Sequence, residues 1–541
     1  MRKGKRILAT VLGMTLFAGC MAGCGSNGGS DEGGAKLTGE KITITAAVNG
    51  HGQEWLENAA AAFTKETGVA VDVAWDAMLD TNLTTILETE GVDKSDIYVA
   101  GTYEWKLWLE HGLIEDVTDF LNEADESEGG KSLNERMVSE AYRYILDDEG
   151  NKLQGVVPFT TSTHGIVYNV EIMNYLCHDV LGWEDGHDYP INTKELFEVF
   201  EALNTATQEG KNVELLTYQQ DGKTYDVKPL VWSGSVGTLE FLFYPWLGQY
   251  EGQENITAYM QNVGIKPTHT DCEGVYVAYQ MICDLMNITS DENGNVYSSN
   301  SIPNCVSYNQ TGSQSQFLLG KALMIPGADW FYSEMESTIE DVENVGFMPI
   351  PWMSDEQGNP LTADGVEMPK NEDGTYRPYD YYTSSAEYMC IPKDASDKDN
   401  AKQFIRFITS GEYLPKLVND IQSGVAFEYD DSQVEASVWF ERVLAVRDAC
   451  TKISFNSDSK LAQYGRIGFY NNPATAPYSQ LSTGAFGNTE KWVDSANGKV
   501  LKEGEKASGV SVTENVYNYV ILNHKAAVSG WDESKQMVGL K

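Results

Sequence analysis

Four segments of this sequence are rich in glycine, short polar side chains or aromatic side chains at or near the ends of predicted strands. They are Asn49–Gly52, Ala100–Trp105, Thr160–His164 and Gly327–Tyr332. In open parallel α/β sheets, ligands bind beyond the carboxyl ends of the strands. Flat rings suit the apolar faces of a ligand, and hydroxyl, amide and carboxylate groups suit its hydroxyls. The pattern therefore favours non-covalent binding of a polyhydroxylated small molecule.

The sequence offers little to support catalysis or a bound metal. It has no G-x-S-x-G, no H-E-x-x-H and no P-loop motif, and its eight cysteines match no zinc-ligand spacing. The segment 291–296 imitates a calcium loop but has no glycine at the sixth position. We therefore expect no enzyme activity, no cofactor and no metal. An exported glycoside hydrolase remains the alternative, because 80 acidic residues provide many carboxylate pairs.

Length and charge narrow the class of protein further. A chain of 541 residues exceeds one ordinary core, which predicts at least two domains. The formal net charge of −42 opposes contact with nucleic acids and anionic membranes. We expect no nucleic-acid partner, and a neutral ligand suits this field better than an anionic one.

The N-terminus has the pattern of an export signal. Four basic residues within the first six positions precede the apolar run Ile7–Phe17, which is too short to span a bilayer. The following F-A-G-C-M-A-G-C resembles a bacterial lipobox, and both Cys20 and Cys24 fit it. We predict a signal peptide at 1–24, lipidation at Cys24, because a flexible linker at 25–40 follows it directly, and an anchored protein on the outer face of the cell membrane. A plain secretory cut is the alternative.

Hydrophobic periodicity predicts alternating strands and helices after residue 40. Strands at 41–48, 69–75 and 96–100 enclose helices at 53–67 and 82–90, which favours a parallel sheet flanked by helices. Further strands are predicted at 153–159, 165–168, 322–325, 344–351 and 387–392, and a helix at 400–410. Asp-Gly or Asn-Gly pairs at 221–222, 293–294 and 373–374 predict hairpin tips.

Several blocks then resemble the family 1 extracellular solute-binding proteins, the group that includes maltose-binding protein. They are F-T-K-E-T-G-V-A-V at 63–71, S-D-I-Y-V-A at 95–100, V-V-P-F-T-T-S-T-H-G-I-V-Y-N at 156–169, F-L-L-G-K-A-L-M-I-P-G-A-D-W at 317–330 and V-G-F-M-P-I-P at 345–351. Each block alone is weak, but their order matches the family. The last 130 residues match less clearly.

The resemblance implies an α/β, two-lobed fold of the periplasmic-binding-protein type II, with hinged crossings near Pro158 and Pro349–Pro351. The lobes would comprise 41–157 plus 352–411 and 158–351 plus 412–541. A monomer of this kind captures a carbohydrate between its lobes and delivers it to the permease subunits of an ABC importer. A surface adhesion or scaffold lipoprotein, without a cleft, is a further alternative.

The resemblance also suggests which residues contact the ligand. It implies that Trp330 stacks on a sugar ring while Asp329 beside it accepts hydroxyl hydrogen bonds. The other candidates are Glu104, Trp105, His51, Thr161, Ser162, Trp232 and Tyr382. Ordinary structural roles compete with each of these, such as core packing for the tryptophans and backbone contacts at the hinge for the hydroxyls.

Overall fold

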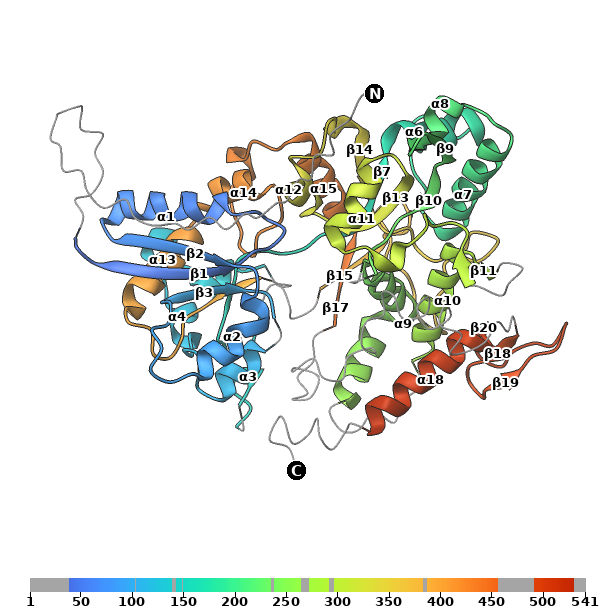
Figure 1. Ribbon diagram of the computed structural model, residues 1–541. Helices are drawn as coiled ribbons and strands as arrows, with labels where there is room; N and C mark the ends of the chain where they lie inside the picture. The colour runs from blue at the N-terminus through green and yellow to red at the C-terminus, as the bar shows by residue number, and fades with distance from the viewer. Residues whose placement is uncertain are drawn as a thin grey trace, which may run out of the picture.

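The computed structural model describes residues 38–102, 104–138, 143–147, 149–234, 238–263, 272–290, 296–382, 387–455 and 491–529. The predicted signal peptide, Cys24 and most of the linker lie outside these residues. The described chain forms two lobes that stand side by side (Figure 1). No helix in this part of the chain is long and apolar enough to cross a lipid bilayer.

Lobe one is built on a five-stranded sheet in the order β2-β1-β3-β16-β6. The strands β1 (Lys41–Ala47), β2 (Ala70–Asp76) and β3 (Ile97–Ala100) are parallel, whereas β16 (Tyr388–Cys390) runs antiparallel to β3 and β6 (Val157–Pro158). The helices of this lobe are α1 (Glu54–Thr67), α2 (Leu79–Glu88), α3 (Trp105–Glu110), α4 (Thr118–Asn122), α5 (Leu133–Arg136), α13 (Lys398–Ile408) and α14 (Leu414–Ile421). A short pair, β4 (Ile145–Leu146) and β5 (Lys152–Leu153), completes it.

The sequence pattern explains the opening unit of lobe one. Alternate residues of β1 are buried, and α1 turns Trp55 and Phe63 into the core. Gly68 ends α1 with a φ of +80°, a conformation that glycine adopts without steric cost, and its N–H donates to the carbonyl of Thr64. The predicted strands and helices between residues 41 and 100 are all present, with bounds shifted by up to three residues.

Lobe two is built on a four-stranded sheet in the order β10-β13-β7-β14. Here β10 (Lys228–Leu230) and β13 (Ala322–Ala328) are parallel, and β7 (His164–Asn169) lies antiparallel between β13 and β14 (Val345–Met348). Its helices are α6 (Val170–Asn174), α7 (Thr193–Gln208), α8 (Val213–Leu216), α9 (Glu240–Val263), α10 (Glu273–Met286), α11 (Gln310–Leu318), α12 (Phe331–Met335) and α15 (Val438–Ala449). Short helical turns lie at 175–180, 305–307 and 342–344 in lobe two, at 126–128 in lobe one and at 431–433 between α14 and α15.

The described residues define three passages of the chain between the lobes. The first connection joins β6 to β7, as the resemblance implied near Pro158. The second passage lies between β15 (Tyr379–Tyr382) and β16, further along than the expected crossing at Pro349–Pro351. Trp352 explains the difference, because its N–H and carbonyl bond to Ile191 and Thr193 and hold the chain on lobe two. The third connection, residues 422–437, joins α14 to α15.

These passages move two of the expected lobe boundaries. The segment from Trp352 to β15 lies with lobe two, where β15 pairs in parallel with β17 (Thr451–Ser454) beside α9. Helix α14 packs on α1 and so belongs to lobe one, where Asn58 donates to Asp420. Lobe one therefore extends to residue 421, and the segment from 352 to β15 belongs to lobe two.

The C-terminal region adds a small sheet and a helix to lobe two. Strands β18 (Trp492–Asp494), β19 (Lys499–Val500) and β20 (Ser511–Thr513) are antiparallel, and α18 (Glu514–Ser529) packs on α10 (Figure 1). The hairpin predicted at 221–222 is confirmed by β8 (Thr217–Gln220) and β9 (Lys223–Asp226). The tip predicted at 293–294 lies outside the described residues, between the paired strands β11 (Ile288–Ser290) and β12 (Val296–Ser298).

Candidate functional site

The candidate site lies where β1, β13 and the three connections meet. Asp329 and Trp330 follow β13 directly, and the N–H of Asp329 donates to the carbonyl of Thr163 in the first connection at 3.0 Å. Trp330 is the N-cap residue of the short helix α12, and its ring is half-buried. The end of one strand therefore presents a carboxylate and an indole side by side.

A column of charged and aromatic side chains supports Trp330 from lobe two. The ring of His164 meets Trp330 edge-on, with centroids 5.9 Å apart, and stacks on Tyr381 at 4.2 Å. Nδ1 of His164 lies 2.8 Å from the fully buried carboxylate of Asp380, which also contacts the ammonium of Lys452. Burial alone would raise the pKa of Asp380, but the charge of Lys452 and the contacts with Lys452 and His164 outweigh burial and lower it. The column fixes His164, and through it the edge on which Trp330 rests.

The loop after β1 brings lobe one against this column. A Cβ atom on Gly50 would lie 2.8 Å from Cδ1 of Trp330, closer than side chains tolerate. Only glycine therefore fits this position without displacing the loop or the indole. The loop of lobe one and Trp330 of lobe two are in direct contact across the gap between the lobes.

His51 in the same loop connects to two of the three passages. Its Nδ1 lies 2.8 Å from Oε2 of Glu387, and its Nε2 lies 3.2 Å from Oγ of Ser423. The Ser423 hydroxyl donates to Oδ2 of Asp329 at 2.6 Å, and the N–H of Gly424 adds a longer bond at 3.3 Å. His51 is 7% exposed and Asp329 is fully buried. One network therefore links lobe one, lobe two, and the second and third passages.

The electrostatic character of this network is acidic. Burial raises the pKa of Asp329, and His51 and Ser423 offset only part of the shift. Burial also raises the pKa of Glu334 on α12, although Gln314 donates to its carboxylate at 2.6 Å. Oδ1 of Asp329 has no hydrogen-bond partner among the described residues. The site therefore offers carboxylate acceptors for the hydroxyl or ammonium donors of a ligand.

The polar residues of the first connection lie beside this network. The N–H of Thr161 donates to the carbonyl of Gly424 at 3.0 Å, and the carbonyl of Ser162 accepts from Lys452. Both side chains are half-buried, as is that of Tyr382 at the end of β15. Backbone contacts thus join the first and third connections, and the Thr161 and Ser162 side chains keep part of their surface free for a ligand.

A comparison with protein-family models identifies the family. The model of the bacterial extracellular solute-binding proteins matches residues 58–428. The chain belongs to this family. A sequence search of curated proteins found no match.

Solved structures of other solute-binding proteins share the two-lobed fold. A chitin oligosaccharide binding protein aligns with a TM-score of 0.55 at 13% identity, covering 91% of this chain and 99% of its own. The GacH receptor of Streptomyces glaucescens aligns with a TM-score of 0.55 at 13% identity, covering 93% and 99%. The maltose/maltodextrin-binding domain of Bdellovibrio bacteriovorus, bound to maltotriose, has a TM-score of 0.53 at 13% identity, covering 90% and 100%.

Two of the residues expected in the binding site, Trp105 and Trp232, lie in the cores of the lobes, and a third, Glu104, lies on the surface. Trp105 has no exposed surface and meets Tyr388 edge-on in the core of lobe one. Trp232 is also fully buried, and its Nε1 donates to Ser301 inside lobe two. Glu104 is exposed at the start of α3. A ring without exposed surface cannot stack on a ligand, so Trp105 and Trp232 are not part of the proposed site.

Four network residues were not candidates in the sequence: Glu387, Ser423, Asp380 and Lys452. Each comes from a different part of the chain, and each has the local pattern of an ordinary surface or strand-end residue. Their contacts with His51, Asp329 or His164, and that of Lys452 with Asp380, exist only once the three passages are assembled. No spacing motif in the sequence signals them.

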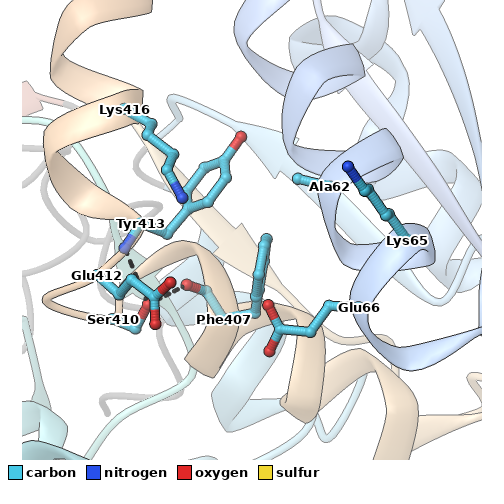
Figure 2. Close-up of a pocket in the computed structure, with 8 residues that line it drawn as sticks. All are labelled: Ala62, Lys65, Glu66, Phe407, Ser410, Glu412, Tyr413 and Lys416. Carbon is cyan, nitrogen blue, oxygen red and sulfur yellow. Dashed lines mark hydrogen bonds between the residues drawn. The ribbon is translucent and has the colours of Figure 1, made fainter. Parts of the chain in front are cut away.

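A separate pocket of about 390 Å³ lies on lobe one (Figure 2). It lies between α1 and the segment from α13 to α14, with Phe407 and Tyr413 at its aromatic side and Lys65 and Lys416 at its rim. It shares no residue with the network around His51 and Asp329. Among the described residues, no group of three or more His, Cys, Asp or Glu side chains is placed to hold a metal.

Proposed function

We propose that this solute-binding protein captures a carbohydrate between its lobes, outside the cell, and hands it unchanged to an ABC importer. The observation that carries the proposal is Trp330 set between the loop of lobe one and the acidic network of Asp329. An indole face covers the C–H surface of a sugar ring, and carboxylates accept its hydroxyl hydrogens. The structural neighbours, which include a chitin oligosaccharide binding protein and a maltotriose complex, support the same ligand class.

The proposed ligand contacts come from both lobes. Lobe two contributes the half-buried Trp330 ring, and lobe one contributes His51 from the loop after β1. The Asp329 carboxylate is fully buried in the structure and would reach a ligand only after the lobes separate. Thr161, Ser162 and Tyr382 supply hydroxyls at the passages. Because these groups converge from separately moving bodies, hinge closure would assemble the site around the ligand.

Thermal-shift measurements with a panel of saccharides test this proposal. We expect maltotriose, raffinose or a chitin oligosaccharide to raise the midpoint of unfolding, with spermidine and a tripeptide as controls. A ligand at 100 times its Kd stabilises the folded state by about 2.7 kcal/mol. Stabilisation by spermidine and by none of the saccharides would contradict the carbohydrate assignment. Mass spectrometry of the recovered saccharide separates binding from hydrolysis.

We further propose that the protein acts as a monomer and that lipids on Cys24 anchor it to the outer face of the cell membrane. The basic and apolar residues before Cys24 and the small residues around it support this reading. In cells fed a radiolabelled fatty acid, we expect the label on the wild type and on Cys20→Ala but not on Cys24→Ala. Label that persists in Cys24→Ala and disappears in Cys20→Ala would place the anchor at Cys20 instead.

A further inference from the structure

His51 is the one side chain in the described site through which the loop of lobe one contacts both the second and the third passage. Its two ring nitrogens face opposite partners, Glu387 at 2.8 Å and Ser423 at 3.2 Å. Ser423 in turn holds Asp329 of lobe two through a 2.6 Å bond. The ring therefore sits at the joint where a movement of the lobes must break or stretch contacts.

Carboxylates from three different elements surround His51, in addition to the Ser423 hydroxyl of the third passage. Glu387 precedes β16, Asp329 follows β13 and Glu334 lies on α12, and all three attract a charged imidazole. Neutral imidazole would lose most of this attraction, because the remaining interaction is between dipole and charge. The strength of the contact between His51 and these carboxylates therefore depends on whether the imidazole ring carries a second proton.

We propose that His51 is a pH-dependent latch, which in its charged form holds the loop 49–52 against Glu387, Ser423 and Asp329 and, on losing its proton, loosens the lobes. The part of this inference that concerns ligand release rests on the proposed function. The contact between Gly50 and Trp330 places the latch directly beside the ring that would cover the ligand. Opening the latch would therefore uncover the site.

The direction of the pH effect follows from the neighbours of the ring. Burial alone would lower the pKa of His51, but Glu387, Asp329 and Glu334 outweigh burial and raise it above 6.5. Once the lobes separate, the pKa of the His51 ring returns toward its ordinary value. The latch therefore contributes fully below pH 6.5 and is lost as pH rises through the raised pKa. Each pKa unit of the difference corresponds to about tenfold in the equilibrium between joined and separated lobes.

A lower limit comes from the carboxylates. Burial raises the pKa of Asp329 and of Glu334, so stronger acid protonates them and removes part of the attraction. The latch is therefore strongest in mildly acidic solution. A comparison of pH 6 with pH 8.5 uses this window. Burial brings the pKa of Glu240 and of Lys106 to about 7, so both titrate in the same range, and the His51 ring must be followed directly.

The test uses small-angle X-ray scattering of the ligand-free protein as a function of pH, together with histidine NMR. We expect the radius of gyration to rise between pH 6 and pH 8.5, with a midpoint above 6.5 that matches the titration of the His51 ring. His51→Gln abolishes the transition, and Glu387→Gln moves its midpoint down. His111→Gln, which changes an exposed histidine in the same lobe, leaves the transition unchanged.

Two results would overturn the latch. One is a radius of gyration that does not depend on pH, and the other is a transition that survives in His51→Gln. If His51→Gln fails to fold, an unchanged His51 titration midpoint in Glu387→Gln overturns the proposal in its place. Because these measurements need no sugar, a protein that binds no carbohydrate yet shows the His51 transition would retain the latch and lose the proposed function.

Discussion

Trp330→Ala is expected to weaken carbohydrate binding by about 30-fold or more. Truncation of a central aromatic anchor costs about 2 kcal/mol or more, and each 1.4 kcal/mol is tenfold in Kd. Trp330 is half-buried against His164 and lies against Gly50 of the opposite lobe, so its truncation removes the ring at the contact between the lobes. Isothermal titration with the best saccharide of the panel measures the loss.

The matched control is Trp492→Ala, which removes a tryptophan that is 45% exposed on β18 in the C-terminal sheet. It should leave the Kd within about twofold, because β18 belongs to the C-terminal sheet, which packs on α10 through β20 and lies away from the passages. Trp330→Phe keeps a ring and should fall between the two. Equal affinity of Trp330→Ala and wild type would remove Trp330 from the site.

Asp380→Ala is expected to cost about 3–5 kcal/mol of folding stability, a large share of the total stability of a typical folded protein. The carboxylate is fully buried and contacts His164 and Lys452, so its removal leaves two groups without their anionic partner. It also accepts from the N–H of Tyr381 at 2.6 Å. Chemical denaturation monitored by circular dichroism measures the change.

The exposed pair of Lys41 and Asp72 provides the comparison, since Asp72→Ala should cost less than about 1 kcal/mol. The pH dependence gives a second readout. Because the pKa of Asp380 is lowered below 3.8 in the folded protein, its contribution is present above pH 3.8 and is lost as pH falls through the lowered value. A difference between wild type and Asp380→Ala that persists unchanged at lower pH would contradict this account.

Much of the fold could be predicted from the sequence because short segments determine their own secondary structure. The alternation in β1, the buried stripe of α1 and the glycine at 68 each determine a short element without help from distant residues. The second passage could not be predicted in this way. The two prolines near residue 350 resemble the end of a strand, but the hydrogen bonds of Trp352 to Ile191 and Thr193 keep the chain on lobe two.

In the candidate site, too, some residues could be predicted from local sequence patterns and others could not. Asp329, Trp330 and His51 follow strands that belong to the two central sheets, so the rule about strand ends brings them together. Trp105 and Trp232 also follow strands, but a tryptophan after a strand packs into a core equally well. Sequence alone does not separate these outcomes, because burial depends on which elements cover the ring.

The negative charge of the chain bears on the kind of ligand that the site accepts. The charge of −42 belongs to the whole chain, yet the network around His51 concentrates carboxylates where a ligand would bind. Carboxylates at this place accept hydrogen bonds from many hydroxyls, and they also disfavour anionic ligands. The composition therefore agrees with a neutral polyhydroxylated ligand, while the arrangement of the carboxylates depends on the fold.

Isothermal titration of the purified protein with oligosaccharides tests the central claim most directly. We predict saturable binding with one ligand per chain, loss of that binding in Trp330→Ala, and recovery of the saccharide with its mass unchanged. Absence of heat with every saccharide, or turnover of the saccharide into smaller products, would contradict it.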